Sequence, residues 1–283
     1  MKRLHLAEPR GICGGVRRAL AMLEEKRREP GVCCVLHEIV HNNFVIHRLK
    51  AQGVRFVETL AEVPDGATVI FSAHGVPPAV EAEAARRGLR AVDATCPLVK
   101  RLQCAAAESA ARGEQTILIG HRGHPEVEGV LGQAPGRILL LEDEAGIAAL
   151  PETTGPVRVL SQTTLDTERV ARLIPQLRKR YPGLIAAAGV CCATEERQRA
   201  VRELAAEVEA MIVVGSPRSS NSNRLREIAA EHGPAWLVDT PEELAALPLD
   251  PVGELGLTAG ASVPDELTGQ VIAALTARGF TVV

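Results

Sequence analysis

Three cysteines occur in similar local settings, where a thiolate could bind a metal or react. Cys13 lies in a glycine turn before a helical stretch, Cys96 precedes Pro97 and an alanine-rich stretch, and Cys191 follows an apolar run. Helix N–H groups and the helix dipole stabilise a thiolate at such a position. A single cysteine of this kind is more often buried and structural, so the interest lies in the three as a set.

The three cysteines are each followed by a polar residue at the same distance. A spacing of 28 residues is found in the pairs Cys13–His41, Cys96–His124 and Cys191–Ser219. A second polar turn follows in each case, at His74, Thr163 and Ser262. Such recurrence indicates repeated supersecondary units. We therefore expect three units, although length alone suggests about two domains.

Strand-like runs alternate with helix-like runs along the chain, which favours right-handed βαβ units and parallel sheets. The predicted fold class is α/β, with three doubly wound domains related by a pseudo-threefold axis. Each domain would contain a small, mostly parallel sheet of about four strands, and the three would surround a central cluster cavity. The expected units are residues 1–95, 96–190 and 191–270, followed by a C-terminal segment, 271–283. The cysteines and polar turns would lie at the carboxyl ends of strands, where open α/β sheets bind ligands.

The composition gives no general reason to bind nucleic acid or membranes, since the net charge is −3 and 46% of the 283 residues are hydrophobic. The amino terminus has no apolar signal segment, and no stretch approaches the roughly 18 apolar residues of a membrane span. These features predict a cytoplasmic protein. Seven cysteines without a CxxC motif are more typical of reduced thiols or metal ligands than of a disulfide framework.

Three thiolates from three units would not complete a structural zinc site, which takes four protein ligands. They suit an iron–sulfur cluster. A [4Fe-4S] cluster normally takes four cysteines, so a set of three leaves one Lewis-acidic iron open to polarise a substrate oxygen. On the residues alone, three structural cysteines remain the alternative.

The polar turns supply hydrogen-bond donors at expected helix starts, where backbone N–H groups favour phosphate. The candidates are His41, His74, His124, Ser219, Ser220, Asn221 and Ser262. Taken singly, the serines and the asparagine could be helix caps, and the histidines could be capping or buried residues. Glu126 is the one carboxylate inside these turns and is the natural proton donor. Its alternative role is a first-turn glutamate that favours the helix dipole.

One motif indicates a different chemistry. His37-Glu38-Ile39-Val40-His41 matches HExxH, the pattern of zinc metallohydrolases, with Glu58 or Glu62 as a third ligand. That pattern needs a helix, whereas the preceding residues are typical of a strand. An iron–sulfur redox sensor is a non-enzymatic alternative, but no basic run or helix-turn-helix signal is visible.

Taken together, these segments resemble the 4-hydroxy-3-methylbut-2-enyl diphosphate reductase family of the non-mevalonate isoprenoid pathway. The resemblance covers nearly the whole chain. Its segments are Gly11–Ala19, His37–Asn42, Phe71–Val76, Asp93–Val99, Gly123–Gly129, Gln162–Thr164, Cys191–Thr194, Ser219–Leu225 and Thr258–Ser262. Ile12, Ser161, Arg218 and Cys192 depart from the family pattern, and the 28-residue spacing favours Cys191 over Cys192 as the equivalent cysteine.

The resemblance implies one [4Fe-4S] cluster with three cysteine ligands, Cys13, Cys96 and Cys191, whose open iron takes the allylic hydroxyl of the substrate. It implies that the diphosphate is held by His41, His74, His124, Ser219, Ser220, Asn221 and Ser262. Glu126 and Thr163 would be catalytic, and Thr163 would also contact the substrate. Two electrons from ferredoxin or flavodoxin, with protons, would then give isopentenyl diphosphate and dimethylallyl diphosphate.

Overall fold

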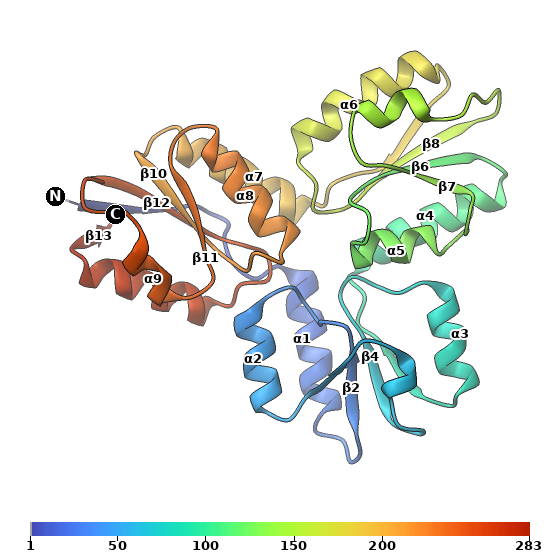
Figure 1. Ribbon diagram of the computed structural model, residues 1–283, viewed down its shortest axis with the longest axis horizontal. Helices are drawn as coiled ribbons and strands as arrows, with labels where there is room; N and C mark the ends of the chain where they lie inside the picture. Colours follow the sequence, from blue (N-terminus) through green and yellow to red (C-terminus); the bar gives the residue numbers. More distant parts are fainter. Residues whose placement is uncertain (1) are drawn as a thin grey trace. The chain divides into compact units, whose positions relative to one another are not determined.

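The computed structural model describes residues 2–283, which contain three parallel β-sheets (Figure 1). The contacts divide the chain into two compact units. One comprises residues 2–16, 40–52 and 192–283, and the other comprises residues 17–39 and 53–191. The first unit holds a five-stranded sheet and the second holds two four-stranded sheets. The α/β class and the three parallel-sheet units are therefore confirmed, while the pseudo-threefold arrangement stays a prediction.

The first four-stranded sheet forms from the earlier part of the two-sheet unit. Its strands are β2 (Cys33–Leu36), β3 (Arg55–Val57), β4 (Thr68–Phe71) and β5 (Arg90–Asp93), in the order β3-β2-β4-β5. Helix α3 (Pro78–Arg86) and the 3-10 turn η1 (Leu60–Glu62) pack on one face, against a cluster that includes Leu36, Val69 and Phe71. Helix α1 (Gly14–Lys26) buries Ala19 and Leu23.

The second four-stranded sheet is covered by helices on both faces. Its strands are β6 (Gln115–Ile119), β7 (Ile138–Leu141), β8 (Val157–Ser161) and β9 (Ile185–Ala188), in the order β7-β6-β8-β9. Helices α4 (Pro97–Ala111) and α5 (Pro125–Leu131) pack around Leu118 and Leu160. Helix α6 (Thr167–Arg180) packs on the opposite face, around Ile117 and Val159, and η2 (Ala145–Ala149) adds Ile147 there. Neighbouring residues point to opposite faces because the side-chain period of a strand is two.

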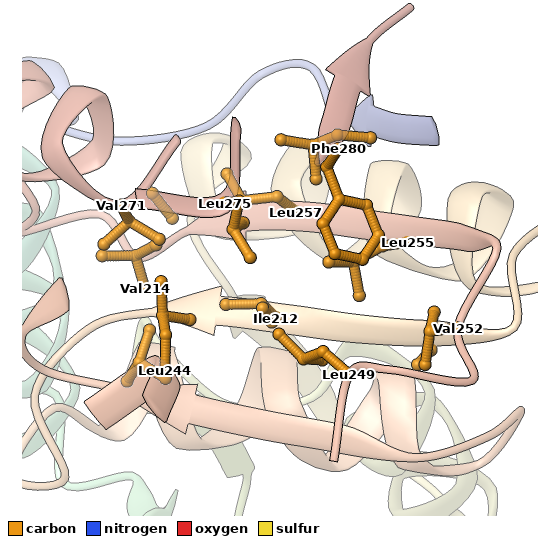
Figure 2. Close-up of a cluster of buried hydrophobic side chains, with 14 of the residues drawn as sticks. Ile212, Val214, Leu244, Leu249, Val252, Leu255, Leu257, Val271, Leu275 and Phe280 are labelled. Carbon is orange, nitrogen blue, oxygen red and sulfur yellow. The ribbon is translucent and has the colours of Figure 1, made fainter. Parts of the chain in front are cut away.

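The five-stranded sheet has the same two-sided construction. Its strands are β1 (Lys2–Leu6), β10 (Ala210–Val214), β11 (Ala235–Val238), β12 (Glu254–Ala259) and β13 (Phe280–Val282), in the order β11-β10-β12-β1-β13. Helix α9 (Asp265–Ala277) and η3 (Pro241–Ala246) cover Ile212, Val214 and Leu257 on one face, as Figure 2 shows. Helices α7 (Cys192–Ala205) and α8 (Ser220–Ala230) cover Met211 and Val213 on the other.

The N-terminal strand differs from the expected organisation. We expected residues 2–6 in the first unit, but β1 pairs with β12 and β13 in the C-terminal sheet, where Leu4 lies beside Leu255. The expected tail, 271–283, likewise ends as β13 in that sheet. The physical reason is burial: β1 lies between β12 and the last repeat's own final strand, β13, and this position buries Leu4 fully in the core. The expected boundaries near residues 95 and 190 stay predictions.

Local helix signals agree closely with the structure. Asn42 caps α2 (Asn43–Ala51), where its Oδ1 accepts a hydrogen bond from the Val45 N–H at 2.9 Å, as expected for that residue type. Gly53 follows with a φ of +86°, which favours glycine. The sequence pattern predicts a helix over residues 195–209, whereas α7 begins earlier, at Cys192, and ends at Ala205. Within residues 2–283, no helix combines the length and apolar content that crossing a bilayer needs.

Candidate functional site

The predicted site residues occupy corresponding positions in the three sheets. The first four strands of every sheet lie in the same order. The second strand of the repeat lies at the edge, and the first, the third and the fourth strand follow it in that order across the sheet. Cys13 follows β1, Cys96 follows β5 and Cys191 follows β9, so each cysteine comes after a fourth strand. The 28-residue spacing therefore reflects a structural repeat. Each cysteine follows the fourth strand of one sheet, and the polar residue 28 positions later follows the first strand of another sheet.

The polar turns follow the first and third strands of each repeat. His41, His124 and Ser219 come after β2, β6 and β10, whereas His74, Thr163 and Ser262 come after β4, β8 and β12. The first and third strands are adjacent in every sheet, with the second and fourth lying on opposite sides of them. This is the topological switch point, the place where open α/β sheets bind ligands. The expected placement of the turns is confirmed for each sheet by itself.

Glu126 and Thr163 form a buried pair in the two-sheet unit. The Thr163 N–H donates to Glu126 Oε1 at 2.6 Å, and the Thr163 hydroxyl donates to Oε2 at 2.8 Å. Glu126 is only 2% exposed. Burial raises the pKa of its carboxyl from 4.5 to about 7, although the two Thr163 donors act in the opposite direction. A carboxyl with this pKa can hold a proton near neutral pH and can also release it.

The two predicted cluster cysteines of this unit, Cys96 and Cys191, are linked through the main chain to predicted site turns. The Cys191 N–H donates to the Thr163 carbonyl at 3.1 Å, so this cysteine lies next to the residue that holds Glu126. The Cys96 N–H donates to the Ala73 carbonyl at 3.0 Å, immediately before His74. The structure therefore brings each cysteine close to a polar turn of the same sheet.

The turn that leads into Cys96 is fixed by Asp93. Its carboxylate accepts from the Thr95 N–H at 3.0 Å and also from the Thr95 hydroxyl, and Lys100 Nζ lies 3.1 Å from Oδ2. Burial raises the pKa of Asp93, but the bonds from Thr95 and Lys100 outweigh it and the net pKa is lowered. The carboxylate is therefore ionised at neutral pH and orders the segment before the cysteine.

The two predicted site histidines of this unit, His74 and His124, lie edge to face. The rings of His74 and His124 have centroids 5.7 Å apart and are perpendicular. His124 is the N-cap of α5, and its Nδ1 accepts the Glu126 N–H at 3.2 Å. An acceptor nitrogen carries no proton, so the neutral ring of His124 is protonated at Nε2, which can donate. His74 Nδ1 is paired with the Ser72 hydroxyl at 3.2 Å.

Gln162 supports this site but was not among the predicted site residues. Its side chain is fully buried, accepts the His121 N–H at 3.0 Å through Oε1 and donates to the Thr164 hydroxyl at 3.0 Å. A Cβ at Gly120 would come within 2.7 Å of Val127, so glycine is required for this close packing. The Gln162-Thr163-Thr164 segment was the available sequence signal, but its pattern does not show which side chain is buried.

The remaining polar turns lie in the unit that holds the five-stranded sheet. The Ser262 hydroxyl donates to the His41 carbonyl at 3.1 Å, which brings these two turns together. Ser219 is the N-cap of α8, where its hydroxyl accepts the Ser222 N–H at 3.2 Å. Ser220 is the first residue of that helix. Ser219 therefore has the capping role that its residue type favours.

Asn221 is buried without satisfying its side chain. It is 4% exposed, and neither Nδ2 nor Oδ1 has a hydrogen-bond partner among the described residues; the same holds for the hydroxyls of Ser222 and Thr258. Native proteins pair nearly all such groups. A Cβ at Gly260 would come within 2.1 Å of the Ser222 hydroxyl and 3.5 Å of Asn221 Nδ2. Unpartnered polar atoms in a tight, glycine-lined place fit a polar ligand.

The cysteines have the chemistry that an iron–sulfur cluster requires. Cys13, Cys96 and Cys191 have intermediate exposure, and Cys192 is exposed as the first residue of α7. Cys13 belongs to one compact unit, and Cys96 and Cys191 belong to the other. Within residues 2–283, no group of three His, Cys, Asp or Glu side chains is positioned to hold a metal ion. The all-thiol donor set fits a cluster, and the ligation itself stays a prediction.

The zinc metallohydrolase interpretation is wrong in its structural premise. HExxH needs a helix to bring both histidines to one face, but β2 ends at Leu36, α2 begins at Asn43, and His37 has a φ of +58°. Glu58 lies beside the exposed His37 at 3.2 Å. Glu62 instead accepts hydrogen bonds from the Glu58 and Thr59 N–H groups at the start of η1.

Parallel sheets with a proton-holding carboxyl and hydrogen-bond donors at the ends of their strands are typical of α/β enzymes. The chain belongs to the LytB family of iron–sulfur enzymes, because the family model described as "LytB protein" matches residues 4–276. The expected family resemblance is thereby confirmed.

Curated and solved relatives agree with this assignment. The 4-hydroxy-3-methylbut-2-enyl diphosphate reductase of Burkholderia pseudomallei (strain 1026b) is 47% identical over 98% of this chain and 90% of its own. The solved E-1-hydroxy-2-methyl-but-2-enyl-4-diphosphate reductase of Plasmodium falciparum has a TM-score of 0.95 at 33% identity, covering 99% of this chain and 91% of its own. A solved (E)-4-hydroxy-3-methyl-but-2-enyl diphosphate reductase, the terminal enzyme of the non-mevalonate pathway, has a TM-score of 0.70 at 34% identity, covering 98% and 100%.

Proposed function

We propose that this chain is a 4-hydroxy-3-methylbut-2-enyl diphosphate reductase. The reaction breaks the allylic C–O bond of the (E)-substrate, consumes two electrons and two protons, and releases water with isopentenyl or dimethylallyl diphosphate. The similarity to reductases over nearly the full chain supports this assignment. The single structural observation that carries it is the buried Glu126 carboxyl, whose pKa of about 7 lets it deliver a proton to a leaving hydroxyl.

The proposed cofactor is one [4Fe-4S] cluster with Cys13, Cys96 and Cys191 as ligands. A bound cluster would supply single electrons, delivered by ferredoxin or flavodoxin, and one Lewis-acidic iron. Support comes from the equivalent position of the three thiols after the fourth strand of each sheet. Cys192 lies at the exposed start of α7 and is not assigned as a ligand.

Glu126 and Thr163 would deliver the proton. Below about pH 7 the Glu126 carboxyl is mainly protonated. The Thr163 hydroxyl lies 2.8 Å from Oε2 and can accept that proton while passing its own to a bound substrate oxygen. Burial excludes bulk water from the carboxyl, so the proton is directed to the substrate.

The diphosphate would be bound by side chains from the polar turns. The proposed set is His41, His74, His124, Ser219, Ser220, Asn221 and Ser262. The protonated Nε2 of His124 is a donor of the required kind, and Asn221 presents a buried amide that has no hydrogen-bond partner among residues 2–283. Phosphate oxygens would satisfy that amide and would also accept from N–H groups at the start of α8.

Anaerobic purification tests the cofactor assignment. We expect a brown protein with iron and sulfide each near about four per chain, and a visible spectrum that changes when the diphosphate substrate is added. Replacement of Cys13, Cys96 or Cys191 by Ser should each abolish the cluster. Cys192→Ser is the matched control and should retain it. A colourless protein fully loaded with zinc, or cluster loss in the Cys192 variant alone, would contradict the proposal.

Turnover separates the reductase from an iron–sulfur redox sensor. Glu126→Gln should keep its iron and visible spectrum but lose reduction of the substrate, because an amide cannot deliver the proton. A sensor has no use for that proton and should tolerate the change. Undiminished product formation by the variant would refute the role of Glu126.

A further inference from the structure

A buried arginine connects the Cys13 loop to the start of α7. Arg197 lies on α7 and is only 4% exposed. Its Nε and Nη2 both donate to the Gly11 carbonyl, at 3.2 and 2.7 Å, and Nη1 donates to the Ala193 carbonyl at 2.7 Å. All of these residues belong to the same compact unit.

The two acceptor carbonyls have similar places in the sequence. Gly11 is two residues before Cys13, and Ala193 is two residues after Cys191. The Gly11 loop is otherwise held through N–H groups, since Gly11 donates to the Ala259 carbonyl and Cys13 donates to the Ala261 carbonyl, both at 2.9 Å. Arg197 is therefore the side chain that fixes the carbonyl side of this loop.

The charge of Arg197 makes this arrangement costly. Its hydrogen-bond partners are main-chain oxygens, and none of them is a carboxylate that forms an ion pair with the buried guanidinium. An apolar residue of similar volume would often be as stable or more stable. Lysine could not replace it, because only the planar guanidinium can direct two N–H groups at one carbonyl and a third at another. These contacts indicate that Arg197 acts through the directions of its hydrogen bonds and not through a net gain in stability.

We propose that Arg197 is a positioning residue for cluster binding, which it supports by fixing the Cys13 loop against the helix that follows Cys191. This inference rests on the proposed function, because it assumes that Cys13 and Cys191 are cluster ligands. Residues that orient metal ligands typically change metal affinity by about 10- to 100-fold when they are removed. Arg197 is predicted to act in this range without touching substrate.

The test compares Arg197→Lys and Arg197→Met with Arg199→Met. Arg199 lies on the same helix, but its side chain is 69% exposed and its ion pair to Glu203 measures 3.9 Å. The anaerobic holoproteins are mixed with an iron chelator, and bleaching of the visible spectrum is followed. Both Arg197 variants should lose iron at least about tenfold faster than wild type. Arg199→Met should match wild type.

A second readout separates positioning from a general loss of stability. In the metal-free proteins, alkylation of each cysteine by iodoacetamide is measured by peptide mass spectrometry. The Arg197 variants should show a change at Cys13, while Cys104, which is already exposed on α4, keeps its wild-type rate. A change at every cysteine together, or wild-type iron retention in both variants, would overturn the proposal.

The experiments distinguish a failure of the proposed function from a failure of the proposed Arg197 role. If wild-type protein binds no cluster under reconstitution, the proposed function fails first. A selective change at Cys13 would then still show that Arg197 positions the loop, whereas an unchanged Cys13 rate would remove that role as well.

Discussion

Replacement of Glu126 by Gln should remove a pH dependence of stability that burial creates. Gln has the same shape and no charge, so it imitates the protonated carboxyl. The Thr163 N–H can still donate to Oε1, at the position where the distance is 2.6 Å, and the Thr163 hydroxyl can accept from the new amide in place of donating at 2.8 Å. The pair is therefore retained, and the change acts on charge alone.

The size of the effect follows from the pKa. The folded state binds the proton more tightly than the unfolded chain because the pKa rises from 4.5 to about 7. The contribution of Glu126 to the free energy of unfolding is therefore highest below the unfolded pKa. It falls as the pH rises between these two values and stays low above the folded pKa. The total loss is roughly 3 kcal/mol, since one unit of pKa corresponds to about 1.4 kcal/mol.

Urea unfolding under anaerobic conditions, at about pH 5 and about pH 8, measures this difference. Between the two values, Glu126→Gln should gain about 2 to 3 kcal/mol relative to wild type. Glu128→Gln is the matched control, because Glu128 is exposed on the same helix and should leave the wild-type profile unchanged. Parallel profiles for wild type and Glu126→Gln would show that the carboxyl is not protonated near neutral pH.

Three further changes test the site and its support. Asn221→Ala should leave the urea-measured free energy of unfolding unchanged or higher, because the lost amide has no partner in the described part of the chain, while KM for the diphosphate substrate rises; a stability loss would contradict this. Gly260→Ala should destabilise by about 1 to 3 kcal/mol, since the new Cβ would lie 2.1 Å from the Ser222 hydroxyl; a double-mutant cycle with Ser222→Ala should recover part of the loss, and strict additivity would refute the clash. Thr163→Val removes a hydroxyl that lowers the pKa of Glu126, so the pH range over which the urea-measured stability falls should extend upward; a downward shift would contradict the direction.

Much of the local structure could be predicted from the sequence. The sequence pattern predicts a helix over residues 97–111 and a strand over residues 138–141, and α4 and β7 have these bounds. Asn42 caps α2 as its residue type favours. These features depend on neighbours within a few residues, which is the range over which side-chain periodicity and capping act. The recurring cysteine spacing likewise indicated three repeats, because each repeat has its own strand and helix pattern.

Tertiary structure alone decided which distant segments meet. A strand pattern does not specify its partner, so only the folded chain shows that β1 pairs with β12 on one side and with β13 on the other. The same limit applies to side chains. Burial raises the pKa of Glu126 and outweighs the two Thr163 donors, which lower it. Arg197 contacts Gly11, which is distant in the sequence. The sequence alone determined the kinds of chemical groups present and their repeat, whereas packing decided their burial, partners and charge, because those depend on contacts that no local pattern encodes.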